Sequence, residues 1–154
     1  MLGGMADPVR SEHLARFPVD AERLWEHVVD VDRYRTWWPW LRRLDAREVA
    51  EGEVWRCTIQ GRVPYRLRLR LTLVEVDAPS RVRADVDGDL RGWAELRISP
   101  DGDGRSELDL RSSLAPTGTM VCIGAALAPG IARRGHDRII THGMRRMGAA
   151  LDGR

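Results

Sequence analysis

The sequence contains no lysine, so all 25 of its basic residues are arginine; with 23 acidic residues, the net charge is +2. The arginines alternate with acidic residues and form no long runs, and we attribute the absence of lysine to GC-rich codon usage. Nucleic-acid binding needs a basic patch or stripe on one surface. The charge pattern therefore gives no support to a nucleic-acid partner.

Cysteine is also scarce. Cys57 and Cys122 are the only two, and both have apolar sequence neighbours. This pattern predicts two buried free thiols in a reducing compartment. Residues 1–9 lack the basic-then-apolar layout of a secretory signal, and we expect them to form a flexible leader ahead of a single domain at 10–151. The expected location is the cytoplasm.

Long apolar runs are also missing. The uncharged stretch 112–132 is long enough to span a bilayer, but it consists largely of small residues and contains Pro116 and Pro129. It also lacks the aromatic residues that flank membrane spans. We expect this stretch to hold the end of a strand, a turn and the start of a buried helix, which makes membrane contact the less favoured expectation.

Several motifs that carry chemistry are absent. The sequence has no P-loop and no nucleophile elbow, and residues 101–104 (Asp-Gly-Asp-Gly) have the composition of a hairpin turn. His136 and His142 are six residues apart, which places them about 240° apart around a helix, so they cannot ligate one ion. Neither cysteine has a partner at ligand spacing. We expect no metal and no other cofactor.

The most informative stretch that is present runs from Tyr65 to Val76. Between positions 65 and 73, every odd residue is apolar and every even residue is polar. Period two places all the leucines on one side of a strand and all the arginines on the other. A sheet with one apolar face must be covered on that face, and the helix-like last third of the chain is the long element left to cover it.

Turn residues divide the rest of the chain into short elements. A strand is predicted at 11–17, a helix from an Asp20 cap through Val29, and a second short helix that Asp32 caps and Pro39 stops. Further strands are predicted at 42–49, 54–60, 65–76, 81–88, 93–99 and 106–114. A slip in the alternation at 73–76 predicts a bulge there. Short turns between the strands make the sheet antiparallel.

The C-terminal third has helical periodicity. From about Gly118 to Leu151, apolar residues recur at helical spacing in the stripe Ile140, Met144, Met147 and Leu151. The complete order is therefore a strand, two short helices, about six strands and a long helix.

This order, together with the local sequence, resembles the START-like (SRPBCC) superfamily, and within it the polyketide cyclase/dehydrase and lipid-transport proteins. The similar segments are 17–25 (FPVDAERLW), 34–40 (YRTWWPW) and 135–140 (GHDRII). The resemblance implies an α+β helix-grip fold. In that fold a curved antiparallel sheet of about seven strands wraps around a long C-terminal helix. It also implies a cavity between sheet and helix that holds a hydrophobic or aromatic small molecule.

Two residues are candidates for chemistry in this cavity. His136 precedes Ile140 by one helical turn, so it would act there as a general acid or base or orient a ligand oxygen. The alternative is a buried histidine bonded to a backbone carbonyl or a carboxylate. Tyr65 shares the parity of the leucines, so its hydroxyl would hold a carbonyl or enol oxygen, or else the ring forms a lid whose hydroxyl reaches solvent.

A larger set of residues is expected to line the cavity. Trp37, Trp38 and Trp40 follow the short helices, and indoles suit flat aromatic ligands; packing of the helices on the sheet edge is the alternative for at least one of them. Trp25 is assigned to the core and Trp93 is left unassigned. The other expected cavity residues are Trp55, Cys57, Leu67, Leu69, Val86, Leu110, Ile140 and Met144.

These observations leave three functions open. The first is a carrier or sequestering protein for a hydrophobic or aromatic small molecule. The second is a polyketide aromatase/cyclase-dehydratase that uses His136 and Tyr65. The third is transfer of a lipid or quinone at membranes, with residues 112–132 as an entry lid. Whether the protein is an enzyme stays open, and either a monomer or a homodimer is compatible with the sequence.

Overall fold

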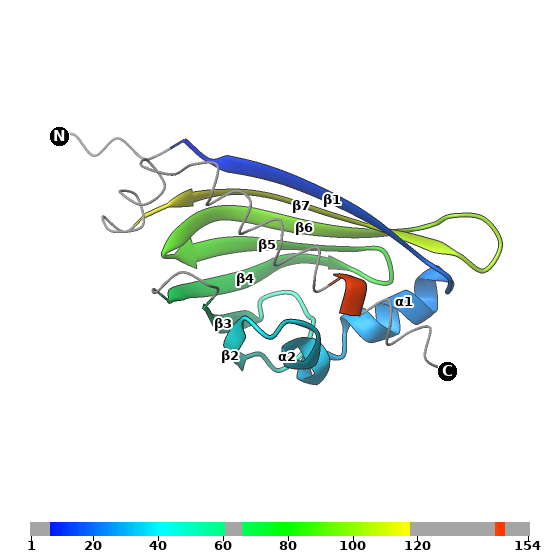
Figure 1. The fold of residues 1–154 in the computed structure, drawn as a ribbon, viewed down its shortest axis with the longest axis horizontal. Helices are drawn as coiled ribbons and strands as arrows, with labels where there is room; N and C mark the ends of the chain where they lie inside the picture. The colour runs from blue at the N-terminus through cyan, green and yellow to red at the C-terminus, as the bar shows by residue number, and fades with distance from the viewer. Residues whose placement is uncertain (1–6, 61–65, 118–143, 147–154) are drawn as a thin grey trace.

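The structure, a computed structural model, describes residues 7–60, 66–117 and 144–146 (Figure 1). Within these residues a strand is followed by short helical elements and six more strands. In chain order they are β1 (Val9–Phe17), α1 (Ala21–Val28), a 3-10 turn (Val31–Arg33), α2 (Tyr34–Trp37), β2 (Leu41–Asp45), β3 (Val54–Ile59), β4 (Leu67–Asp77), β5 (Arg81–Gly88), β6 (Leu90–Pro100) and β7 (Ser106–Pro116).

All seven strands form one antiparallel sheet in the order β1-β7-β6-β5-β4-β3-β2. Each strand from β2 to β7 pairs with the strand next to it along the chain. Strand β1 instead pairs with β7, the last strand of the sheet in sequence. The register between β4 and β5 shifts between Leu73 and Glu75, which confirms the predicted bulge. The curled sheet agrees with a helix-grip fold, and the predicted C-terminal helix lies outside the described residues except for the turn 144–146.

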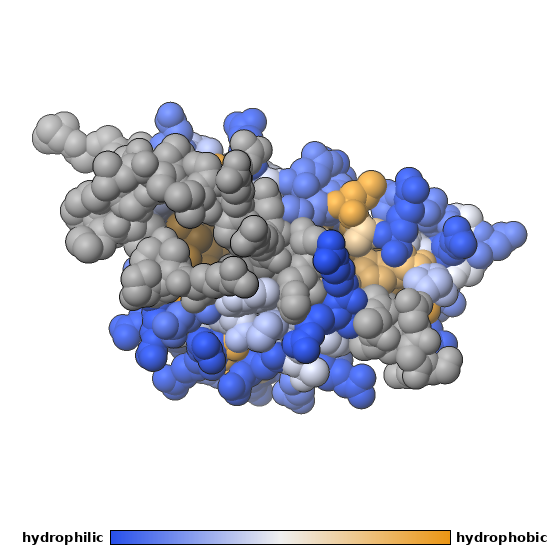
Figure 2. Space-filling view, viewed as in Figure 1, coloured by the Kyte–Doolittle hydropathy of each residue, from blue (hydrophilic) through white to orange (hydrophobic). Residues whose placement is uncertain are grey.

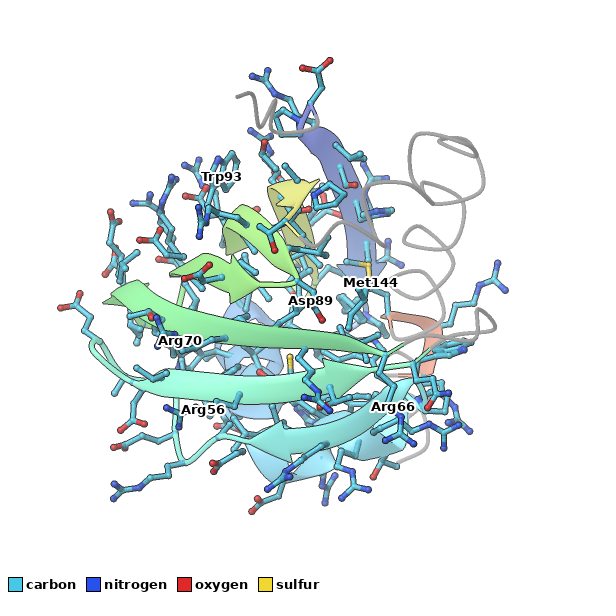
Figure 3. The ribbon with its side chains drawn as sticks, turned by 90° about the vertical axis from the view of Figure 1, so that its left-hand side faces the viewer. Arg56, Arg66, Arg70, Asp89, Trp93 and Met144 are labelled. Carbon is cyan, nitrogen blue, oxygen red and sulfur yellow. The ribbon has the colours of Figure 1, made fainter. Side chains whose placement is uncertain are left out.

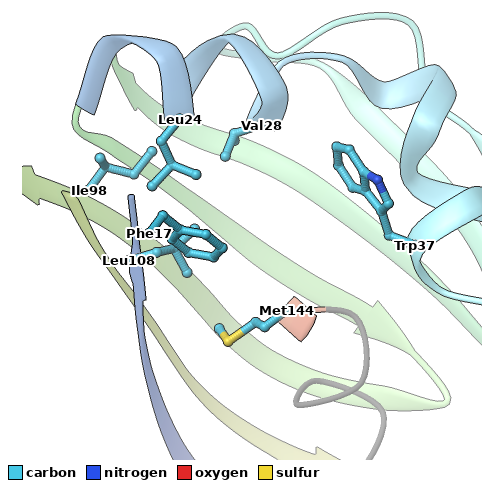
Figure 4. Packing of buried hydrophobic residues seen from close by; sticks show 7 residues of the cluster. All are labelled: Phe17, Leu24, Val28, Trp37, Ile98, Leu108 and Met144. Carbon is cyan, nitrogen blue, oxygen red and sulfur yellow. The ribbon is translucent and has the colours of Figure 1, made fainter. Parts of the chain in front are cut away.

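Helix α1 begins where the sequence predicts. The carboxylate Oδ1 of Asp20 accepts a hydrogen bond of 2.8 Å from the backbone N–H of Arg23, which satisfies a donor that a helix N-terminus leaves unpaired. The helix packs Leu24 and Val28 against the sheet. Figure 4 shows the resulting core, which contains Phe17, Leu24, Val28, Trp37, Ile98, Leu108 and Met144.

Two predicted boundaries are wrong. Asp32 does not cap the second helix, because it lies inside the 3-10 turn and the N-cap of α2 is Arg33. The strand predicted at 42–49 ends at Asp45. The chain then packs against a second core cluster, formed by Val31, Trp55, Leu73 and Ala84. There the indole N–H of Trp55 donates to the Glu48 carbonyl at 3.0 Å, and Val49 packs beside it.

The outer face of the sheet carries rows of charged residues. The register aligns one residue from each of five neighbouring strands in the row Glu75, Arg83, Glu95, Arg111 and Glu12, in which the charges alternate. A second row joins β2 to β5 and includes Arg56 and Arg70, a like-charged pair that Figure 3 labels on adjacent strands. The opposite-charge pairs of the first row support one register over its alternatives.

Glu95 is the buried member of the first row, with 5% of its surface exposed. Its carboxylate accepts hydrogen bonds from Arg81 at 2.8 Å and from Arg97 at 2.6 Å, and Arg83 lies 3.5 Å away. Burial by itself raises the pKa of the Glu95 carboxyl. The hydrogen bonds and charges of Arg81 and Arg97 outweigh that effect and hold the pKa below its ordinary value.

We expect Glu95→Gln to lower the free energy of unfolding by about 2 kcal/mol at pH 7, because it leaves the arginines without their buried partner. Since the pKa is lowered in the folded state, the carboxylate stabilises the protein above its unfolded pKa of about 4.3, and this contribution disappears as the pH falls through the folded value. Urea unfolding of both proteins at several pH values measures the difference.

The matched control is Glu12→Gln, which removes an exposed carboxylate 3.0 Å from Arg111 in the same row. It should change stability by less than about 0.5 kcal/mol. Equal effects of the two substitutions, or a difference that does not shrink as the pH is lowered below about 4.3, would contradict the role assigned to Glu95.

Candidate functional site

The inner face of the sheet, which carries Leu108, Ala84 and Leu69, has a row of small side chains across its middle. The register places Ser11 opposite Ser112, Ser112 opposite Ala94, and Ala94 opposite Ala84. We call the row formed by Ser11, Ser112, Ala94 and Ala84 the floor. It crosses β1, β7, β6 and β5, and its side chains are shorter than those of the neighbouring inner rows.

Longer apolar side chains border the floor on both sides. Toward α1, the next inner row contains Leu110, Leu96 and Val82, and Leu96 and Leu110 pack against the core beneath α1. Away from α1, the next row contains Leu114 and Val86. The floor is therefore a row of small side chains between two rows, or walls, of longer apolar ones, and we call the three rows together the trough.

Gly92 interrupts the wall away from α1. It lies between Val86 and Leu114 with a φ of +153°, and a Cβ there would come within 1.8 Å of the Ser113 carbonyl oxygen. Only glycine is compatible with this approach of two strands. Figure 2 shows apolar surface over the left-hand ends of β5 and β6, the end of the sheet where Gly92 lies.

The β1 end of the floor is polar. Ser11 and Ser112 face inward together, and His13 lies two residues from Ser11 on the same face. The Ser11 Oγ is buried and has no hydrogen-bond partner among the described residues. His13 also borders a hollow of about 400 Å³ that runs along β1 beside Phe17 and Met144.

Sequence reasoning missed these polar residues, although a signal was present. Counting back from the buried Phe17 by twos gives Ala15, His13 and Ser11, which therefore share its face.

Tyr34 is the centre of an aromatic cluster at the other end of the inner face. Its ring centroid lies 5.9 Å from Trp37, 5.6 Å from Trp38 and 5.9 Å from Trp55, with edge-on geometry to Trp38 and Trp55. Its hydroxyl donates to the Val28 carbonyl. Burial, with a smaller contribution from a nearby carboxylate, raises the pKa of Tyr34, so the phenol stays protonated.

The predicted tryptophans are divided among different environments. Trp37 and Trp55 are buried in the two core clusters, whereas Trp38 and Trp40 are half-buried. The indole Nε1 of Trp38 is buried without a hydrogen-bond partner among the described residues. Trp93, which the sequence left unassigned, lies on the outer face. The Arg83 guanidinium carbon lies 4.7 Å from the centroid of its ring. Figure 3 shows that Trp93 points away from the side on which Met144 lies.

The other predicted cavity residues lie on the inner face where they are described. Leu69, Val86 and Met144 are buried, and the half-buried residues are Cys57, Leu67 and Leu110. Cys57 is opposite Leu69, and Met144 packs into the core below α1. Tyr65, His136 and Ile140 lie outside the described residues.

Cys57 is a titratable group on this face that offers little reactivity. Burial raises the pKa of the Cys57 thiol to about 11, so the thiol is neutral at pH 7. Among the described residues, no cluster of three or more His, Cys, Asp or Glu side chains could hold a metal ion. In the same part of the chain, no helix combines the length and the apolar character needed to cross a membrane.

A one-layer curled antiparallel sheet with short helices after its first strand and an inward-facing trough is the arrangement of the START-like superfamily. Residues 8–152 match the family described as polyketide cyclase / dehydrase and lipid transport. The chain belongs to this family. No curated protein matches it in sequence.

Solved structures share the fold at low identity. A conserved protein from Geobacillus kaustophilus is 12% identical with a TM-score of 0.74, and the match covers 94% of this chain and 96% of that one. The ZhuI aromatase/cyclase from Streptomyces sp. R1128 is 16% identical with a TM-score of 0.65, over 95% and 92% of the two chains. The di-domain aromatase/cyclase StfQ from the steffimycin pathway is 13% identical with a TM-score of 0.75, over 96% of this chain and 51% of that chain.

We expect Cys57 to react slowly with iodoacetamide at pH 7 to 8, because only the thiolate is nucleophilic and the pKa of this thiol is raised to about 11. In a Cys122→Ser background, the alkylation rate should still be rising between pH 9 and pH 10. Mass spectrometry of the modified peptide follows the reaction. A rate that levels off near pH 8.5, as in the protein unfolded by guanidinium, would contradict the burial of Cys57.

Proposed function

We propose that the protein binds a hydrophobic or aromatic small molecule against the inner face of its sheet and carries it without transforming it. The floor is the observation that carries this proposal. Ala84 and Ala94 are small residues at central positions of the sheet, and rows of longer apolar side chains flank them. A trough of this form suits a flat apolar ligand.

The protonation states of Cys57 and Tyr34 support binding rather than chemistry at these two groups. Cys57 and Tyr34 both have raised pKa values, so neither supplies an anion at neutral pH. The Tyr34 hydroxyl is already used by the Val28 carbonyl. A carrier needs none of these groups to ionise, whereas an acid/base enzyme needs at least one poised near the working pH.

Polyketide cyclisation and dehydration is the second candidate, and His13 on the inner face is the observation that favours it. An imidazole there would complement His136 and Tyr65, which we propose as its acid/base pair, in moving protons on a poly-β-ketone. The fold shared with an aromatase/cyclase is compatible with this candidate. Lipid or quinone transfer rests on the family description alone.

Mass spectrometry of small molecules extracted from freshly purified protein is the first test. We expect one defined aromatic or isoprenoid species at near-stoichiometric amount. Ala94→Leu should lower that amount at least about tenfold, because the larger side chain fills the floor and a misfitted apolar contact loses about 1–3 kcal/mol. Ser113→Leu is the control. Ser113 follows Ser112, the cross-strand partner of Ala94, so this substitution adds the same side chain on the outer face.

An empty wild-type protein that also fails to take up naphthalene in equilibrium dialysis would refute the carrier. Bound ligand that survives Ala94→Leu unchanged would place the site elsewhere. Turnover of a poly-β-ketone that is lost in His136→Ala or Tyr65→Phe, with ligand affinity retained, would favour the enzyme over the carrier.

A further inference from the structure

We propose that Ser11 and Ser112 form a hydrogen-bonding end of the site, which selects ligands that carry a hydroxyl or carbonyl oxygen at one end of an apolar body. This inference rests on the proposed function and adds to it the orientation of the ligand and the chemical group that is recognised. Three features of the inner face carry it: the pairing of the two serines, the unpartnered Ser11 hydroxyl, and the apolar far end of the floor.

The two hydroxyls are adjacent. Ser11 on β1 and Ser112 on β7 are direct partners in the antiparallel register, which puts their Cβ atoms about 5 Å apart on the same face. Each hydroxyl has one donor and two acceptor positions. Together they can donate hydrogen bonds to a ligand carbonyl oxygen. They can also bind a ligand hydroxyl, with one serine accepting its hydrogen and the other donating to its oxygen.

The Ser11 hydroxyl is poised for such a partner. Its oxygen is buried and has no hydrogen bond among the described residues, and Ser112 beside it is also buried, with 6% of its surface exposed. A buried polar group without a partner is unfavourable until something satisfies it. A ligand oxygen that does so gains affinity which a pure hydrocarbon cannot gain.

The opposite end of the floor is apolar. The inner row continues from Ala84 to Leu73 on β4, and both residues are buried in one cluster with Trp55 and Val31. From β1 to β5 the floor crosses three interstrand spacings, about 14 Å, which accommodates a fused bicyclic or tricyclic body. A ligand with one oxygenated end therefore lies with that end at β1 and β7 and its apolar body over β6 and β5.

The test compares naphthalene with 2-naphthol, which differ by one hydroxyl, in equilibrium dialysis against wild-type protein and the variant Ser11→Ala/Ser112→Ala. We expect the dissociation constant of 2-naphthol, divided by that of naphthalene, to rise about 5- to 10-fold in the variant. This change corresponds to the loss of one net hydrogen bond. The affinity for naphthalene should change less than about twofold, which also reports that the trough is still folded.

Ser113→Ala is the matched control, because this serine follows Ser112 on β7 but faces outward opposite Trp93. It should leave the ratio unchanged. If both compounds bind and the ratio is the same in wild type and in the double variant, the inference is refuted while the carrier stands. An equal shift in Ser113→Ala also refutes the inference. If wild-type protein binds neither compound, the proposed function fails, and the inference with it.

Discussion

The register of the sheet is the constraint on which both of its faces depend. A shift of one residue between two strands would turn every apolar side chain of one strand outward and every charged one inward. The outer row through Glu95 opposes such a shift, because its alternating charges match in one alignment across five strands. The same alignment brings Ser11, Ser112, Ala94 and Ala84 together on the inner face, so the site is a by-product of the pairing that holds the sheet.

The inner face is divided between packing and space. Near α1, Phe17, Leu24 and Leu108 pack together in the buried core. Farther along the same strands, alanine, serine and glycine replace the large residues. The Tyr34 aromatic cluster lies beyond the floor, where it joins the short helices to β3. Stability and binding therefore occupy different stretches of the same strands.

The amino-acid sequence predicted the strands well, because alternation and turn residues are local signals. The Asp20 cap and the bulge at Leu73 were found in this way. The prediction that Asp32 caps a helix was wrong, because whether a residue can cap a helix depends on whether the preceding turn is already helical. The floor could not be predicted from single strands, because Ala84, Ala94 and Ser112 become one row only when the register between strands is known. Whether Trp37 packs or lines a cavity likewise depends on side-chain packing that periodicity does not encode.

The pairing of β1 with β7 has a consequence for the order of events in synthesis. Phe17 finds its partner in Ser106 and Val9 finds its partner in Leu114, so the first strand leaves the ribosome long before the strand that binds it. The hairpins from β2 to β6 need only neighbouring segments and can form as the chain emerges, whereas contacts between distant segments form slowly. Until β7 is complete, β1 exposes unpaired backbone groups of the kind that chaperones shield and other chains can capture. The serines of the floor meet last, so the proposed ligand site would be one of the final parts of the molecule to form.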